Sequence, residues 1–136
     1  MNEAMKIKNI EKAMEPLGIS IKENFVYGYT EPGLLSSLTY GAFSSFVDME
    51  HFLLIFIKEE VVLVGLTLMG DFSDSYIRIP RKDIELFHAK KGLIQYKLQL
   101  KIKDEKKITI KANKIIAAAK WQKANLAFLN TVHWYQ

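Results

Sequence analysis

The chain of 136 residues contains no cysteine, no long apolar run and no stretch typical of a secretory signal. The absence of cysteine excludes disulfides and thiolate chemistry, and it favours a cytoplasmic location. No apolar run reaches the length that crosses a bilayer, and the charged N-terminal residues lack the apolar core of a signal peptide. With 49% hydrophobic and 25% charged residues, the composition predicts one soluble globular domain.

Catalytic and metal-binding motifs are missing as well. His51, His88 and His133 include no pair at metal-ligand spacing, and Asp71 with Asp74 is too sparse for a calcium loop. The sequence has no phosphate-binding or dinucleotide-binding glycine pattern, and its serines lie in no nucleophile elbow. We therefore predict a protein that is not an enzyme and uses no metal or cofactor. A hydrolase with an unrecognised site is the weakest alternative.

The net charge of +4 is distributed unevenly along the chain. Residues 1–60 carry five lysines against nine acidic residues, whereas residues 78–114 carry 12 lysines and arginines against four acidic residues. An acidic front half and a basic back half are typical of a surface that binds a polyanion. Complementary surfaces between subunits, or a simple requirement for solubility, would give the same pattern.

The most hydrophobic stretch, residues 51–69, predicts a β-hairpin around which the rest of the chain is organised. Two strand-length runs, residues 52–57 and 61–66, are rich in β-branched and aromatic side chains and flank a charged break at residues 58–60. Neither run alternates cleanly between apolar and polar residues. Both faces of this hairpin should therefore be covered.

Residues 2–15 predict an amphipathic helix, with Asn2 as its N-cap and Ile7, Ile10 and Met14 as its apolar stripe. Such a short helix is marginally stable alone, so the stripe should pack on another surface. We expect that surface to be the outer face of the hairpin. A neighbouring subunit is the alternative.

Further strands are predicted on both sides of the hairpin, at Phe25–Tyr29 and at residues 37–43, 76–79, 83–89, 93–103 and 107–112. Alternation predicts that Ile84, Leu86 and Ile94 point inward, with His88 on the same side. One-sided alternation of this kind indicates a sheet with one wet face.

A second helix is predicted over residues 115–129, with Asn113 as its cap. Ala117, Trp121, Ala124 and Phe128 recur at helical spacing and would form one apolar stripe, with Leu129 beside it. Small alanines beside large aromatic side chains suit a helix that lies closely against a sheet.

This order of elements resembles the bacterial pleckstrin-homology-like family, found in small proteins of Gram-positive bacteria and their phages. The segments that carry the resemblance are HFLLIFIKEEVVLVG, IRIPRKDIELFHAKKG, YKLQLKI, KKITIKA and KWQKANLAFL, and it covers roughly residues 20–130. The resemblance implies an α+β fold, a partly open barrel of about seven antiparallel strands in two near-orthogonal sheets, capped by the C-terminal helix. Residues 1–18 would add an extra helix to a single domain spanning residues 19–136.

Eukaryotic members of the wider superfamily bind phosphoinositides through a basic loop in the first hairpin. The corresponding connection here is residues 30–36 or residues 44–50, and neither contains Lys or Arg. This departure argues against a phosphoinositide site of that type. Bacterial members resemble scaffolds and are often oligomeric, so the resemblance implies a non-enzymatic binding or assembly module.

Two surfaces are candidates for binding. The first is apolar and would mediate binding to a protein partner or self-association as a homo-oligomer; its residues are Phe52, Leu54, Phe56, Val62, Val64, Ile7, Ile10 and Met14. The second is a Lys-rich strand face that would bind anionic lipid or another anionic ligand; its residues are Lys90, Lys91, Lys97, Lys101, Lys103, Lys106, Lys107 and Lys111. A solvated face that blocks aggregation is the alternative for these lysines. Nucleic acid is disfavoured as a partner because the face lacks stacking aromatic side chains.

Overall fold

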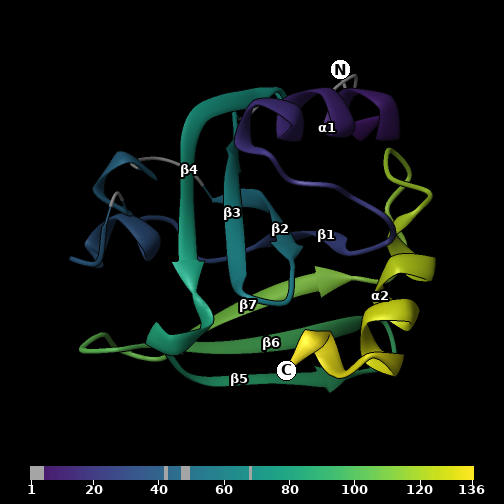
Figure 1. Cartoon of the computed structure of the whole chain (residues 1–136). Helices are drawn as coiled ribbons and strands as arrows, with labels where there is room; N and C mark the ends of the chain where they lie inside the picture. The colour runs from purple at the N-terminus through teal and green to yellow at the C-terminus, as the bar shows by residue number, and fades with distance from the viewer. Residues whose placement is uncertain (1–4, 42, 47–49, 68) are drawn as a thin grey trace.

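The computed structural model describes residues 5–41, 43–46, 50–67 and 69–136. Within this part, seven strands form one antiparallel sheet in the order β4-β3-β2-β1-β7-β6-β5 (Figure 1). The strands are β1 (Phe25–Tyr29), β2 (His51–Phe56), β3 (Glu60–Leu66), β4 (Phe72–Pro80), β5 (Ile84–Lys91), β6 (Gln95–Ile102) and β7 (Ile108–Asn113). One α-helix precedes them, α1 (Ile7–Met14), and one follows, α2 (Gln122–Thr131). The predicted α+β order and the antiparallel pairing are confirmed.

The link between β4 and β5 shows that the sheet is curled. These two strands are at opposite edges of the strand order, but only the 3₁₀-helix η5 (Arg81–Asp83) separates them in the chain. In a flat sheet the two edges would lie about 29 Å apart, whereas the link from Pro80 to Ile84 spans at most about 14 Å. The sheet therefore curves until its edges approach each other, which is consistent with a partly open barrel.

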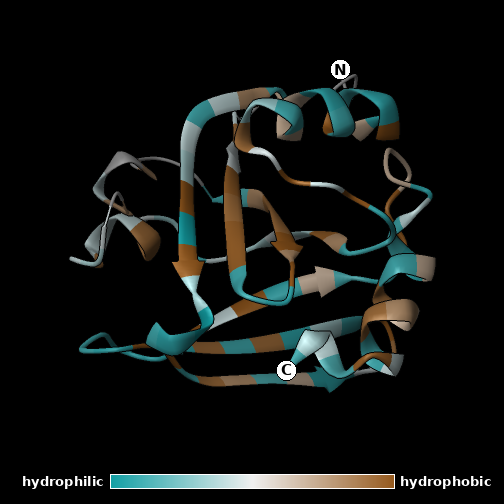
Figure 2. Cartoon of the chain, in the orientation of Figure 1, coloured by the Kyte–Doolittle hydropathy of each residue, from teal (hydrophilic) through white to brown (hydrophobic). Residues whose placement is uncertain are grey.

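Two apolar clusters occupy the two faces of this curled sheet. The inner core lies on the concave side and includes Phe52, Leu54 and Phe56 of β2, with Leu126 and Leu129 of α2. The outer core lies between α1 and the outer face of β2 and β3. Its buried side chains are Met5, Ile10, Met14, Ile19, Phe25, Leu53, Ile55, Val62, Val64, Leu66 and Ala119. Figure 2 shows the consequence, because β2 and β3 are hydrophobic along most of their length whereas β6 alternates.

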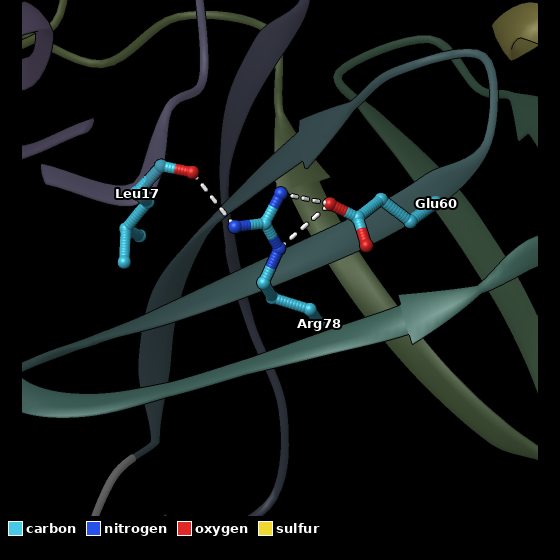
Figure 3. A network of polar contacts seen from close by, with 3 residues as sticks. All are labelled: Leu17, Glu60 and Arg78. Atoms are coloured by element: carbon cyan, nitrogen blue, oxygen red, sulfur yellow. Dashed lines mark hydrogen bonds and ion pairs between the residues drawn. The ribbon is translucent and has the colours of Figure 1, made fainter. Parts of the chain in front are cut away.

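The N-terminal helix packs on its own chain, as one of the two alternatives for it predicted. Ile10 and Met14 are fully buried in the outer core, whereas Ile7, the third residue of the predicted stripe, is 48% exposed. Asn2, the predicted cap, lies outside the described residues. Arg78 of β4 fixes the segment that follows α1 (Figure 3). Its guanidinium donates to the Leu17 carbonyl at 2.7 Å and forms an ion pair with Glu60 of β3.

The seam between β1 and β7 is completed by side chains of α2. The register of these strands holds a single pair, Tyr29 with Lys111. The Gln122 side chain accepts a hydrogen bond from the Tyr27 amide at 2.9 Å and donates one to the Tyr27 carbonyl at 2.8 Å. Asn125 donates to the Phe25 carbonyl at 2.9 Å. Two side-chain amides therefore take the place of the missing strand ladder, because buried backbone groups need partners.

The predicted apolar stripe on the C-terminal helix is wrong. Ala117 and Ala124 are exposed, and the face that α2 buries consists of Gln122, Asn125, Leu126 and Leu129. The helix also begins at Gln122 instead of residue 115. The residues before it pack in the outer core, where the Trp121 ring packs at a tilt of 56° against the Phe25 ring with ring centroids 4.6 Å apart. These tertiary contacts outweigh the helical propensity of the alanines.

The strand predicted at residues 37–43 is also wrong, because two 3₁₀-helices, η3 (Leu35–Ser37) and η4 (Phe43–Phe46), occupy this region. The Ser37 hydroxyl donates to the Leu34 carbonyl at 2.6 Å, a local bond that competes with strand pairing. The buried side chains here recur every three residues, as Leu35 with Leu38 and as Phe43 with Phe46. That spacing suits a 3₁₀ turn and not a strand.

The side chains of β5 after Ile84 point opposite to the predicted direction because of a β-bulge. The register between β5 and β6 shifts between Ile84 and Leu86. The extra residue reverses the alternation after it, so Phe87 is buried while Leu86 and His88 are exposed. Ile94 is likewise 75% exposed instead of inward, because β6 begins only at Gln95.

Candidate anion-binding face

Three of the predicted lysines lie side by side across three strands. Lys90 of β5 pairs with Lys97 of β6, and Lys97 pairs with Lys111 of β7. Residues directly opposite on antiparallel strands have Cβ atoms about 5 Å apart and share one face of the sheet. All three are exposed, and no ion pair with an acidic side chain is present for any of them among the described residues. We refer to Lys90, Lys97 and Lys111 as the lysine row.

The lysine row lies on the same face of the sheet as the outer core. Lys111 pairs with Tyr29 of β1, and Tyr29 pairs with His51 of β2. Two residues further along β2 is Leu53, which is buried beneath the N-terminal segment. The outer face therefore changes from a covered apolar half over β2 and β3 to an open cationic half over β5, β6 and β7.

A polar boundary separates these two halves. The Tyr27 hydroxyl lies 3.0 Å from His51 Nδ1, and burial, with a smaller contribution from Tyr29, raises the pKa of Tyr27 above its ordinary value. Gln95 donates to the Tyr29 hydroxyl at 3.2 Å and to the Asn113 side chain at 2.8 Å. These contacts hold the Tyr29 ring beside Lys111, so the lysine row begins at a fixed edge.

A cavity of about 310 Å³ opens beside the lysine row, where β1 leaves β7. Its lining residues come from two segments of the chain, Lys107, Ile108, Thr109 and Lys111 in and before β7, and Tyr29, Thr30, Glu31 and Leu34 at and after the end of β1. The Thr30 hydroxyl donates to the Thr109 carbonyl at 3.1 Å, which joins these two segments. Two ammonium groups and a threonine pair suit a phosphate group, while the Glu31 carboxylate opposes an anion from the rim.

The other predicted lysines are not part of the row. Lys101 pairs with Glu85 at 2.6 Å, and Lys91 pairs in register with the inward-facing Tyr96, so it lies on the opposite face from Lys90. Lys103 and Lys106 are exposed in the connection between β6 and β7. The structure therefore brings together four of the eight candidates, the lysine row and Lys107.

The predicted apolar interface residues are almost all buried within the monomer. Phe52, Leu54 and Phe56 face the inner core, and Val62 and Val64 face the outer core with Ile10 and Met14. Each of these side chains is at most 4% exposed. Ile7 alone remains accessible to a partner, so this set does not form a continuous surface.

Sequence reasoning missed an exposed apolar group near the lysine row. Leu93 is 92% exposed, Ile94 75% and Ile115 79%. They occupy the β5–β6 turn and the start of the connection from β7 to α2, and we refer to them as the apolar tip. The signal available in the sequence was Lys90-Lys91-Gly92, a turn sequence that directly precedes two apolar residues.

No family model matches the chain, and no curated protein sequence matches it either. Among the described residues, no helix is long and apolar enough to cross a membrane. In the same part of the chain, no group of three or more His, Asp or Glu side chains is placed to hold a metal ion.

Proposed function

We propose that this chain is a non-enzymatic binding module that recognises phosphate-bearing anionic ligands through the lysine row and the adjoining cavity. The lysine row is the observation that supports this most strongly. Like charges directly opposite each other on paired strands destabilise a sheet, so three lysines without acidic partners in one row carry a cost in stability. An anion bound across the row would remove that cost.

We propose that the fold class is pleckstrin-homology-like and that the cellular location is the cytoplasm. Figure 1 supports the class, because β3 and β4 run steeply across the direction of β5, β6 and β7, and α2 lies beside the end of the curled sheet. The connection from β1 to β2, residues 30–50, contains no Lys or Arg. The proposed site on β5 to β7 therefore differs from the first-hairpin loop that eukaryotic members use.

A titration with tripolyphosphate, followed by amide NMR shifts, tests this function. We expect the largest shifts at Lys97 and Lys111 and around Thr109, with an affinity that falls steeply as salt is added. The triple variant Lys90→Glu, Lys97→Glu, Lys111→Glu should weaken binding by more than about tenfold, since each reversal replaces an attraction with a repulsion.

The matched control is the triple variant Lys8→Glu, Lys22→Glu, Lys58→Glu, which makes the same change in net charge at exposed positions elsewhere. It should retain most of the binding. Equal losses in both triple variants would mean that only net charge matters, and an unmodified protein that does not bind tripolyphosphate would refute the function.

Self-association through the sheet edges is the second candidate, and one observation favours it. β4 and β5 end the strand order, so each has a side without a strand partner among the described residues, and each exposes a large side chain, Tyr76 at 44% and Leu86 at 39%. Unpaired edges are ready templates for another chain. A solution mass well above 15.7 kDa in light scattering would support this candidate, and a monomer at all concentrations would exclude it.

A further inference from the structure

We propose that the apolar tip inserts into the surface of an anionic lipid bilayer while the lysine row contacts the headgroups. This inference rests on the proposed function and assigns the phosphate-bearing ligand to a membrane. It draws on four observations: the exposure of the tip, its connection to a rigid part of the fold, the charge of the neighbouring residues, and the distance from the tip to the lysine row.

The three side chains of the tip come from two connections that the fold holds together. The Lys114 amide donates to the Ile94 carbonyl at 2.9 Å, which extends the β6–β7 ladder to the tip. Ile115 follows directly, and the tip residues line one shallow cavity of about 400 Å³ with Asn113, Lys114 and Lys123. Because this hydrogen bond continues the ladder, both connections are held in place. The apolar side chains therefore stay exposed to water.

The turn that presents Leu93 is closed tightly. The Gly92 amide donates to the Gln95 carbonyl at 2.9 Å, and a Cβ on Gly92 would lie only 2.5 Å from that oxygen. Any other residue at position 92 would force the backbone apart. Glycine at position 92 therefore permits a tight turn in which Leu93 is almost completely exposed.

The charged residues in the two sequence segments that contain the tip are all positive. Residues 86–103 contain five lysines, residues 106–136 contain six, and neither segment contains a single Asp or Glu. Lys91 and Lys114 closely flank the apolar residues. Exposed apolar side chains with lysines close by, here Lys114 and Lys123 in the same cavity lining, are typical of segments that lie in the interface of an anionic membrane.

The distance between the tip and the lysine row also fits a bilayer. Lys97 lies three residues after Ile94 along β6, which is about 10 Å at the rise of a strand. Interfacial segments bury their apolar face about 5 to 10 Å deep. When the tip reaches that depth, the lysine row is level with the phosphate groups. A protein partner would instead need about 800 Å² of complementary surface on this side, more than three side chains provide.

Sedimentation with vesicles of phosphatidylcholine, with or without phosphatidylserine, tests the insertion. The unmodified protein should bind only the vesicles that contain phosphatidylserine. The variant Leu93→Ser, Ile94→Ser should lose about a hundredfold in vesicle affinity, since burial of each such side chain is worth about tenfold or more. Its affinity for tripolyphosphate should not change, because the lysine row is intact. The Lys97→Glu variant should weaken both.

The matched control is Ile7→Ser, Met69→Ser, which removes two exposed apolar side chains elsewhere, 48% and 70% exposed. It should bind vesicles like the unmodified protein. A Leu93→Trp variant adds a second readout. The fluorescence that this substitution adds to that of the unmodified protein should shift to the blue on anionic vesicles.

The outcomes separate this inference from the function on which it rests. If tripolyphosphate binds but vesicles do not, or if the Ser variant binds vesicles unchanged, the insertion is refuted and the function stands. A Leu93→Trp variant that binds vesicles without a blue shift would also refute insertion. If the unmodified protein does not bind tripolyphosphate, the function itself fails, and the inference that rests on it fails too.

Discussion

The two halves of the outer face of the sheet share one curved backbone but differ in what covers them. Over β2 and β3, the side chains are apolar, and Ile10 and Met14 of α1 seal them from water. Over β5, β6 and β7, the outer face carries exposed lysines, and no helix in the described part of the chain covers it. Among the described residues, the lysine row has no acidic partner. The chain itself supplies the partner of the first half, and the second half is the one for which we propose a partner from outside.

Under the proposed function, this difference separates stability from binding within one sheet. Burial of apolar area on the covered half stabilises the fold, and its residues are unavailable to a ligand. The open half contributes little to stability, since its like charges repel, and it keeps the groups that attract an anion. Substitutions on the two halves should therefore have opposite consequences.

The largest effect should follow from removing the cover of the first half. Ile10→Ala creates a cavity in the outer core and should lower the free energy of unfolding by about 2 to 5 kcal/mol in a urea titration. Ile7→Ala on the same helix, at a half-exposed position, should change it by less than about 0.5 kcal/mol. Equal effects at the two positions would mean that α1 does not seal this face.

The next effect concerns the seam that joins the two halves. Gln122→Leu keeps the size of the side chain but leaves the Tyr27 amide and carbonyl without their partner. We expect a loss of about 2 to 4 kcal/mol in urea unfolding, because two buried backbone groups lose their hydrogen bonds. Lys123→Leu, one residue further and exposed, is the control. A stable Gln122→Leu protein would show that the seam does not depend on this amide.

A smaller effect is expected near the link between β4 and β5, the two strands at the edges of the sheet. The Tyr40 hydroxyl donates to Asp83 at 2.6 Å, and burial, with this carboxylate, raises the pKa of Tyr40 to about 12. The folded state favours the protonated hydroxyl, so its contribution to stability is complete below pH 10 and is lost as the pH rises through about 12. Tyr40→Phe should be less stable than the unmodified protein at pH 8, and the difference should shrink above pH 10 in parallel urea titrations. A difference that stays constant with pH would contradict this assignment.

The smallest effect, and opposite in sign, should come from the open half. Lys97→Thr relieves repulsion in the lysine row and should raise the free energy of unfolding by up to about 1 kcal/mol at low salt, with no gain at high salt. The same variant should bind tripolyphosphate more weakly. A loss of stability at low salt would show that Lys97 serves the fold, and the comparison of the two halves would fail.

The sequence predicted the strands whose pattern is clear, either an unbroken apolar run or a regular alternation. The unbroken apolar runs at residues 52–57 and 61–66 indicated a hairpin covered on both faces, and α1 with the inner core provides that cover. The alternation in β6 predicted which of its lysines face outward. The link between alternation and exposure is local, so a single strand is sufficient to show it.

Features that depend on distant residues could not be predicted in this way. Burial of Gln122 depends on the incomplete pairing of β1 with β7, which no residue near Gln122 reveals. The reversal at Phe87 depends on a bulge, and the exposure of Ile94 depends on where pairing with β7 stops. Likewise, which lysines form the row follows from strand register, whereas the alternation in the sequence predicts only a Lys-rich strand face.

Hydrogen exchange read by mass spectrometry, with and without vesicles containing phosphatidylserine, tests the difference between the two halves most directly. We predict slower exchange at residues 90–97, which span the β5–β6 turn and the adjoining strand ends, and at residues 111–116, which span the end of β7 and the segment after it. We predict no change in α1, β2 or β3, because their partner is already in place. Slower exchange in α1 or the β2–β3 hairpin, or no change at residues 90–97, would contradict the account.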